Sequence, residues 1–297
     1  MIQNSVRSNW FIRFSLLTAA LTLGLIVFGA VVRVTDSGLG CGNHWPLCNG
    51  SVIPPLDNIT AWIEWLHRLF AILIGLFGIV MLVLAVRGYR THNRLVLGFT
   101  VLAALLYTVQ SLLGAVVVKL DLPPTMVTLH LGNAMLLLAS LLLAGMFAVY
   151  RPGQSYASDR VTTMTYVTAA LSLVIILTGA LVRSSGATLA CTDWPLCNGA
   201  IFPGDQGQLA LVHMVHRYAV TALGISLLVL LIYVYRDRTN PRVRSLALAA
   251  LMAYLAQAAV GAMFVMSRAG AGLGALHVGL AATTWGLLVI LATIVVV

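Results

Sequence analysis

Eight long stretches of mainly apolar residues divide this chain of 297 residues. Each has about the 20 residues that a helix needs to cross a lipid bilayer. They lie near residues 14–33, 60–86, 95–118, 126–150, 161–183, 208–235, 244–266 and 272–297. Only 8% of the residues are charged, against roughly 25% in a soluble domain. Because so few charges cannot cover a surface that faces water, the sequence predicts an all-α polytopic membrane protein.

Positive charges concentrate in alternate loops, for example in residues 87–94 and 236–244. An excess of Lys and Arg marks the cytoplasmic side of a membrane. We therefore expect a multi-pass protein of the cell (inner) membrane with both termini in the cytoplasm. The net charge of +9 follows from this topology, and no basic run interleaved with aromatic residues indicates nucleic-acid binding.

The chain contains an internal repeat. "GAVVRVTDSGLGCGNHWPLCNG", which starts at Gly29, aligns with "GALVRSSGATLACTDWPLCNG", which starts at Gly179. Each repeat holds four of the predicted helices, so the chain returns to its starting side and the repeats have parallel orientation. We predict two four-helix bundles, formed by residues 1–153 and 154–297 and joined by a loop that contains Pro, Gly and Ser.

The cysteines all lie in the two long loops opposite the cytoplasmic side, at Cys41, Cys48, Cys191 and Cys197. Thiols on that side meet an oxidising compartment, where pairs form disulfides. We expect the pairs Cys41–Cys48 and Cys191–Cys197, each closing a small loop. A zinc site with four thiolates is the alternative, although its usual spacing is absent from both pairs. The sequence leaves open whether the pairs are structural or redox-active.

Four histidines occupy equivalent places in the two repeats. His67 and His216 lie in the second helix of each half, and His130 and His277 lie in the fourth. His67 is roughly 10 Å inside its helix at 1.5 Å rise per residue, and His130 is at nearly the same depth. Two imidazoles at one depth on facing helices can ligate a haem iron from both sides. The alternatives are hydrogen bonding between helices and a single haem between His67 and His216.

Glu64 is the only glutamate in the chain and lies inside a predicted membrane helix, three residues before His67. The equivalent position in the second half is His213. A carboxylate here can orient a neighbouring group or act as a general base. Because the halves differ at this position, we expect one haem to be acted upon while the other assists, with Glu64 as the catalytic candidate.

Two arginines end the first helix of each half, Arg33 and Arg183. Their side chains can extend to the membrane interface, or they can bind haem propionates, because arginine matches a carboxylate with two hydrogen bonds. Arg68 and Arg217, which follow His67 and His216, receive no assignment from the sequence.

Together these features resemble the haem A synthase family. The resemblance covers essentially the whole chain and rests on eight helices in two halves, the E-x-x-H at Glu64–His67, the H-R at His216–Arg217, and the fourth-helix histidines His130 and His277. The cysteine pairs match the bacterial branch of the family that has such pairs.

The resemblance implies an oxidoreductase that converts the C8 methyl group of haem O, through a hydroxymethyl stage, to the formyl group of haem A. The product serves terminal haem-copper oxidases, and water supplies the formyl oxygen. The first half would bind the substrate haem between His67 and His130. The second half would bind haem b as a cofactor, with His216 and His277 as axial ligands of the iron. The implied partners are haem O synthase and a quinone or another electron acceptor.

The main alternative function is a dihaem membrane cytochrome with bis-histidine ligation that exchanges electrons with quinone. Such a carrier has no need of one carboxylate beside one haem only, so Glu64 argues for the synthase. A haem transporter would need broken helices, which the sequence does not show. A thiol oxidoreductase would have no use for four buried histidines.

Overall fold

The computed structural model describes the backbone of residues 2–150 and 159–296. This part of the chain forms eight long helices and one short 3₁₀ turn, in the order α1 (Ile2–Val34), α2 (Ile59–Tyr89), α3 (Arg94–Lys119), α4 (Pro124–Val149), α5 (Arg160–Ser184), η1 (Ala187–Leu189), α6 (Gln208–Asp237), α7 (Pro241–Met266) and α8 (Ala271–Ile294). All eight helices are long and apolar enough to cross a membrane. The predicted all-α polytopic class is confirmed.

Helix α1 begins 12 residues before the predicted segment 14–33, because residues 2–13 contain neither Pro nor Gly and let the helix continue beyond its apolar part. The other helix starts follow ordinary capping rules. The Asn58 side chain accepts a hydrogen bond from the Ala61 N–H at the start of α2, and Asn93 and Asp159 cap α3 and α5 in the same way. These side chains replace the helical partners that the first N–H groups lack.

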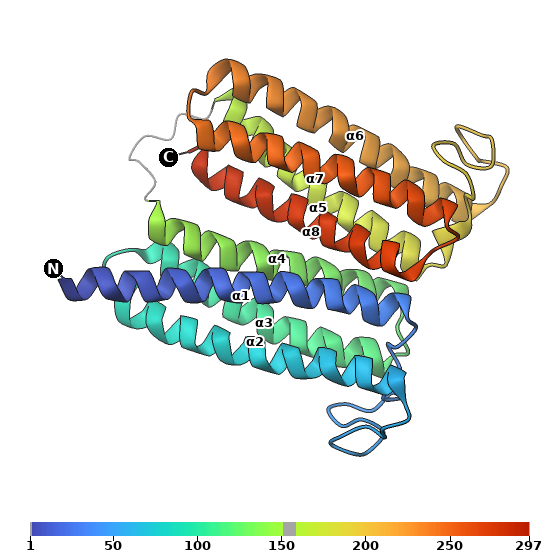
Figure 1. Cartoon of the computed structure of the whole chain (residues 1–297), viewed down its shortest axis with the longest axis horizontal. Helices are drawn as coiled ribbons and strands as arrows, with labels where there is room; N and C mark the ends of the chain where they lie inside the picture. The colour runs from blue at the N-terminus through green and yellow to red at the C-terminus, as the bar shows by residue number, and fades with distance from the viewer. Residues whose placement is uncertain (1, 151–158, 297) are drawn as a thin grey trace.

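The helices form two closed groups of four. In the first half α1 and α3 each contact α2 and α4, and the second half repeats this arrangement with α5 to α8. The halves lie side by side (Figure 1) and contact each other through α1 with α8, α4 with α5, and α4 with α8. The indole N–H of Trp285 donates across this interface to the Met135 carbonyl at 3.0 Å. The predicted domain boundary between residues 153 and 154 lies outside the described residues.

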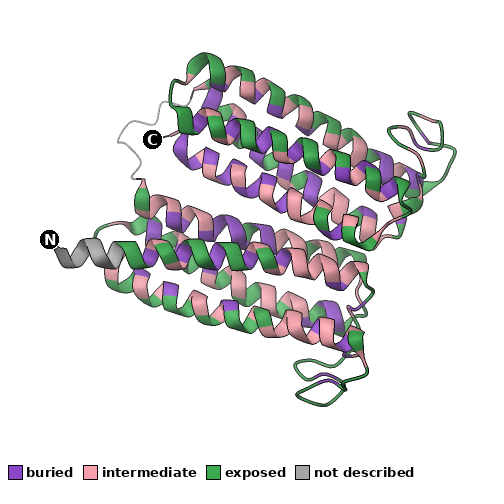
Figure 2. Ribbon diagram, in the orientation of Figure 1, coloured by how far each residue is buried: buried purple, intermediate pink, exposed green. Residues whose placement is uncertain are grey.

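The outward faces of the helices are apolar. Leu76, Leu105 and Ile232 are 55%, 60% and 64% exposed, and exposed residues run along the helices as well as through the loops (Figure 2). Such faces suit lipid, which solvates leucine as well as a protein core does. The protein is therefore a multi-pass membrane protein.

The two cysteine loops, residues 35–58 and 185–207, lie at the same end of the molecule, opposite the start of α1 and the end of α8 (Figure 1). Both predicted disulfides are present, Cys41–Cys48 and Cys191–Cys197. Their four residues are at most 1% exposed. The loops are thus closed units that pack onto the ends of the bundles.

Candidate functional site

A cavity of about 790 Å³ is lined by residues of both halves. Its size lies in the range of roughly 300 to 1,000 Å³ that small-molecule and cofactor sites occupy. Apolar side chains form most of its wall. The polar ones include the predicted catalytic, haem-binding and propionate-binding residues together with His213: Arg33, Glu64, His67, His130, Arg183, His213, His216 and His277. The fold therefore brings these residues to one internal space.

Each of the four equivalent histidines packs against a glycine of the preceding helix. A Cβ atom added to that glycine would lie only 2.8 to 3.3 Å from the imidazole Cε1 atom. The pairs are Gly29 with His67, Gly114 with His130, Gly179 with His216, and Gly261 with His277. Any larger residue would push the ring away, so these glycines fix how closely each imidazole approaches the neighbouring helix.

Both histidines of the second half are oriented by a hydrogen bond at Nδ1. The Thr178 hydroxyl lies 2.9 Å from His216 Nδ1 and donates its own proton to the Ile175 carbonyl, so it accepts from the imidazole. His277 Nδ1 lies 3.0 Å from the backbone carbonyl of Gln257, which can only accept. With the proton on Nδ1, the lone pair of each Nε2 is free. This is the neutral tautomer and the hydrogen-bonding pattern that metal-ligating histidines adopt.

The first half holds its histidines differently. His67 Nδ1 and His130 Nδ1 are buried and have no hydrogen-bond partner among the described residues. Where the second half has Thr178, the first has Phe28, whose ring centroid lies 6.0 Å from that of His67. His130 Nε2 instead lies 3.1 Å from the side-chain amide nitrogen of Gln110. The two histidine pairs therefore share positions but differ in what orients them.

Glu64 joins the first-half site to its disulfide loop. The side chain is buried, at 3% exposure, although it is an acid. Its Oε2 accepts a hydrogen bond of 2.8 Å from the Cys41 backbone N–H, and its Oε1 pairs with the guanidinium of Arg68. Gly40 allows this approach, because a Cβ there would lie 2.3 Å from the Thr60 carbonyl on α2. A carboxylate held by a cation and a backbone donor fits an ionised acid at the cavity wall.

Arg68 also holds the loop itself. Its guanidinium donates to the backbone carbonyls of His44, Pro46 and Leu47, at 3.1 to 3.2 Å. The sequence assigned no role to this arginine. Its loop partners are carbonyl groups, which any residue carries, so no sequence motif could have pointed to them. Its ion pair with Glu64 has the i,i+4 spacing of a helical salt bridge and could have been predicted.

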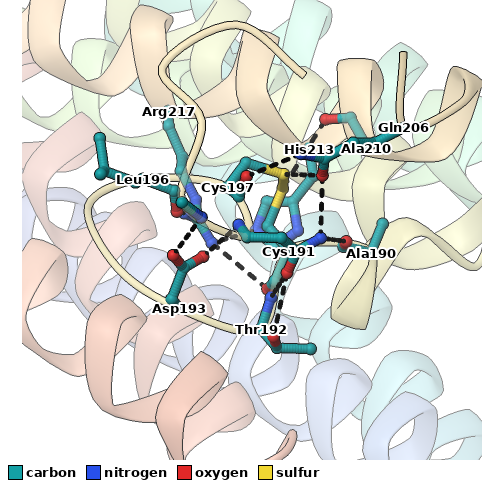
Figure 3. The surroundings of a disulfide bond; sticks show 12 residues. Ala190, Cys191, Thr192, Asp193, Leu196, Cys197, Gln206, Ala210, His213 and Arg217 are labelled. Atoms are coloured by element: carbon teal, nitrogen blue, oxygen red, sulfur yellow. Dashed lines mark hydrogen bonds between the residues drawn. A yellow bond between two sulfur atoms is a disulfide. The ribbon is translucent and has the colours of Figure 1, made fainter. Parts of the chain in front are cut away.

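In the second half an equivalent arginine also holds its loop, but a histidine stands where the first half has Glu64. Arg217 donates to the carbonyls of Pro195, Leu196 and Cys191 and contacts the buried His213, whose Nε2 lies 3.3 Å from its guanidinium. Figure 3 shows His213 and Arg217 gathered at the Cys191–Cys197 disulfide. A neutral imidazole here replaces the carboxylate, so the two sites differ in charge.

Arg33 and Arg183 meet between the halves. Arg183 donates to the Arg33 carbonyl at 3.3 Å and lies 3.7 Å from the exposed carboxylate of Asp36. The Arg33 Nε is buried and lacks a hydrogen-bond partner among the described residues. An unpaired guanidinium nitrogen at the wall of an apolar cavity suits an anionic group of a ligand.

These observations fit haem. The cavity offers paired imidazoles with a glycine beside each, apolar walls for a macrocycle, and an unpaired arginine nitrogen for a propionate. The residues that could hold two irons are His67 with His130 and His216 with His277. Sequence reasoning missed Gln110, Thr178 and Phe28 as residues that contact these imidazoles. The repeat alignment could have drawn attention to them, because Gln110 is shared by both halves whereas Phe28 and Thr178 differ.

Residues 12–289 match the model of the family described as cytochrome oxidase assembly protein (COX15-CtaA). The chain belongs to this family. Relatives named heme A synthase include that of Alkalihalophilus pseudofirmus, 34% identical over 226 residues that cover 74% of this chain and 75% of the relative. Those of Shouchella clausii and Symbiobacterium thermophilum are 34% and 33% identical and cover 86% and 92% of both chains. The resemblance seen in the sequence is confirmed.

Proposed function

We propose that this protein is a haem A synthase, an oxidoreductase that converts the C8 methyl group of haem O to a formyl group through a hydroxymethyl stage. The observation that carries the proposal is the asymmetry of two otherwise equivalent histidine pairs. One pair has the carboxylate of Glu64 at the same cavity wall, and the other has neutral His213 there and Nδ1 hydrogen bonds to both imidazoles. The names of the relatives support an enzyme of haem A biosynthesis.

In this proposal the second half holds haem b as a resident cofactor. His216 and His277 would be its axial ligands. Thr178 and the Gln257 carbonyl each accept a hydrogen bond from Nδ1, which leaves the lone pair of each Nε2 free for the iron. Partners of this kind raise ligand basicity, and their loss typically lowers metal affinity about 10- to 100-fold. When bound, haem b supplies one-electron redox chemistry.

The first half would hold haem O between His67 and His130. Neither imidazole has an Nδ1 partner among the described residues, so these ligands are less firmly oriented than those of the second half. A substrate has to leave after each turnover, and looser ligands suit that need. Arg33, with its unpaired Nε, and Arg183 would bind propionate groups at the outer end of the cavity.

Glu64 would act on water and protons beside the substrate. Oxidation of a methyl group to a formyl group by water releases four protons and four electrons: R–CH₃ + H₂O → R–CHO + 4H⁺ + 4e⁻. The carboxylate can orient the attacking water and accept a proton from it, while Arg68 and the Cys41 N–H keep it in place. General-base catalysis by a positioned carboxylate typically contributes about 10²- to 10⁴-fold in rate.

The electrons would pass to an acceptor such as a quinone, and haem O synthase would be the source of the substrate. The arginine-rich loops lie at the end of the bundle opposite the disulfides. With those loops in the cytoplasm, both termini would be cytoplasmic and the disulfide loops extracytoplasmic.

The deciding experiment is extraction of the haems from purified protein, with identification by mass. The proposal expects haem b together with haem O, its hydroxymethyl form or haem A. Haem b alone, in protein from cells that make haem O, would favour the dihaem electron-transfer cytochrome instead.

A further inference from the structure

The side-chain amide of Gln110 is hydrogen-bonded to the ring nitrogen of His130 that would ligate an iron. Both side chains line the cavity, Gln110 from α3 and His130 from α4. The Gln110 amide nitrogen lies 3.1 Å from His130 Nε2. The other ring nitrogen, Nδ1, is buried and lies 3.9 Å from where a Cβ on Gly114 would be. Nε2 is therefore the nitrogen available to a ligand in the cavity.

The direction of this hydrogen bond follows from two other hydrogen bonds, the first of which has a backbone carbonyl as its acceptor. Asn133 Nδ2 donates to the Leu106 carbonyl at 2.9 Å, which fixes the orientation of the Asn133 amide, since a carbonyl only accepts. The same Nδ2 donates to Gln110 Oε1 at 2.8 Å. Gln110 therefore turns its NH₂ group toward His130. Because an amide NH₂ only donates, His130 Nε2 accepts through its lone pair.

The second half lacks this arrangement. Gln257 is the equivalent of Gln110, but it contacts His277 through its backbone carbonyl and at Nδ1, which leaves Nε2 to the cavity. The position of Asn133 is occupied by Leu280, whose side chain cannot anchor a glutamine amide. Equivalent glutamines thus act differently: Gln110 donates a hydrogen bond to Nε2 of His130, whereas Gln257 leaves Nε2 of His277 free.

We infer that Gln110, held by Asn133, is a displaceable competitor for the His130 lone pair that weakens haem binding in the first half and so favours release of the haem product. This inference rests on the proposed function, in which the first half exchanges its haem and the second half keeps it. When haem leaves, Gln110 takes its place on Nε2, and when haem binds, the amide has to move aside.

The size of the effect follows from the exchange of one hydrogen bond. The net contribution of such a bond corresponds to about a 2- to 10-fold change in an equilibrium constant. An apparent dissociation constant rises as the binding-competent fraction falls. Removing the competitor should therefore tighten haem binding in the first half by about 2- to 10-fold.

The test uses the full chain in detergent, with its retained haem, and ferric haem b as the added probe. The dissociation constant of the added haem is measured from the low-spin absorption change, and its release rate is measured by transfer to a haem-scavenging apoprotein. Gln110→Leu and Asn133→Leu should both tighten binding and slow release. Asn133 does not line the cavity, so Asn133→Leu acts on the haem only through Gln110. Tighter binding in this variant would therefore not come from a new apolar contact between the leucine and the haem. Gln257→Leu is the matched control from the second half.

The inference is overturned if Gln110→Leu weakens binding, because Gln110 would then support His130, or if neither variant tightens it. Equal tightening by Gln257→Leu would overturn it as well, because the effect would not belong to His130. Failure of the proposed function looks different: the wild-type protein would bind no added haem, or His130→Ala would bind it as the wild type does.

Discussion

The two halves of the molecule place the same histidines on the same helices, yet they differ in nearly every polar group that touches them. His216 and His277 each have a fixed Nδ1 partner, whereas His67 has the ring of Phe28 beside it and His130 has the Gln110 amide on Nε2. The glycines behind the imidazoles are the same in both halves. The repeated scaffold therefore sets where the imidazoles lie, and in the proposed function the groups around them set how firmly each half holds its haem.

The largest effect should come from removing the histidines. In the proposed function, His216→Ala or His277→Ala should lose the haem b of the second half, because one axial ligand cannot replace two. His67→Ala or His130→Ala should keep that haem and abolish haem A formation. Haem-to-protein ratios, absorption spectra and mass analysis of the haems measure this. Full haem content and unchanged low-spin spectra in all four variants would contradict the assignment.

Exchange of the buried acid Glu64 should give the next largest effect. Glu64→Gln keeps the shape of the side chain and an acceptor for the Cys41 N–H, but it cannot take a proton and loses the charge that pairs with Arg68. We expect about 10²- to 10⁴-fold slower haem A formation, with haem O or its hydroxymethyl form accumulating on the protein.

His213→Gln is the matched control for this variant, since His213 holds the same position in the other half. It should retain far more activity. If Glu64→Gln makes haem A at a near-normal rate, Glu64 has no catalytic role, and the electron-transfer cytochrome becomes the preferred function.

A smaller effect is expected from the residues that distinguish His67 from His216. Thr178→Val keeps the branched shape but removes the hydroxyl that accepts from His216 Nδ1, and it should weaken haem b binding in the second half by about 10- to 100-fold. The reverse change, Phe28→Thr, offers His67 such a partner and should slow haem release from the first half. The rates of haem release from each half test both variants. An unchanged rate in Thr178→Val would mean that this hydroxyl does not support His216 as a ligand.

The smallest effect concerns the two disulfide loops. Asp193 accepts hydrogen bonds from the backbone N–H groups of Asn198 and Gly199, whereas the first loop has the exposed His44 in its place. Slight burial raises the pKa of Asp193, but these bonds and the nearby Arg217 outweigh it and hold the pKa below its ordinary value of 3.8. Because the folded pKa is depressed, the stabilisation is present above pH 3.8 and is lost as the pH falls through the folded pKa.

Hydrogen exchange measures this difference between the loops. Protection factors of the Asn198 and Gly199 amides should fall below about pH 4, while those of Asn49 and Gly50 in the first loop should not. In Asp193→Asn the second loop should lose its pH dependence. Equal behaviour of both loops in the wild-type protein would show that Asp193 does not stabilise its loop in solution.

Much of this architecture could be predicted from the sequence, because its causes are local or repeated. Apolar length identifies each membrane helix, and the duplicated loop shows which residues are equivalent. The spacing of Cys41 and Cys48, in a loop predicted to face an oxidising compartment, sufficed for the disulfide. Glu64 was identifiable because a lone acid in a membrane helix is costly to keep.

The partners of these residues could not be predicted in the same way. Whether Gln110 reaches His130 through its side chain, or Gln257 reaches His277 through its backbone, depends on how two helices pack and on an anchor such as Asn133. The contacts of Arg68 with its loop were not predicted because the partners are backbone carbonyls. Such contacts depend on tertiary packing, which motif spacing and helix periodicity do not reveal.

The contact between the halves has a consequence for their origin. α1 meets α8 as α5 meets α4, so the interface is the same pair of surfaces used twice, as in a symmetric dimer whose subunits contact each other through identical patches. A single four-helix unit already carries both surfaces, in its first and fourth helices. An ancestor of half this length would have paired with its own copy around two identical sites. Fusion of two such copies into one chain would free the sequence of each site from that of the other, and in the proposed function one site then serves the reaction while the other transfers electrons.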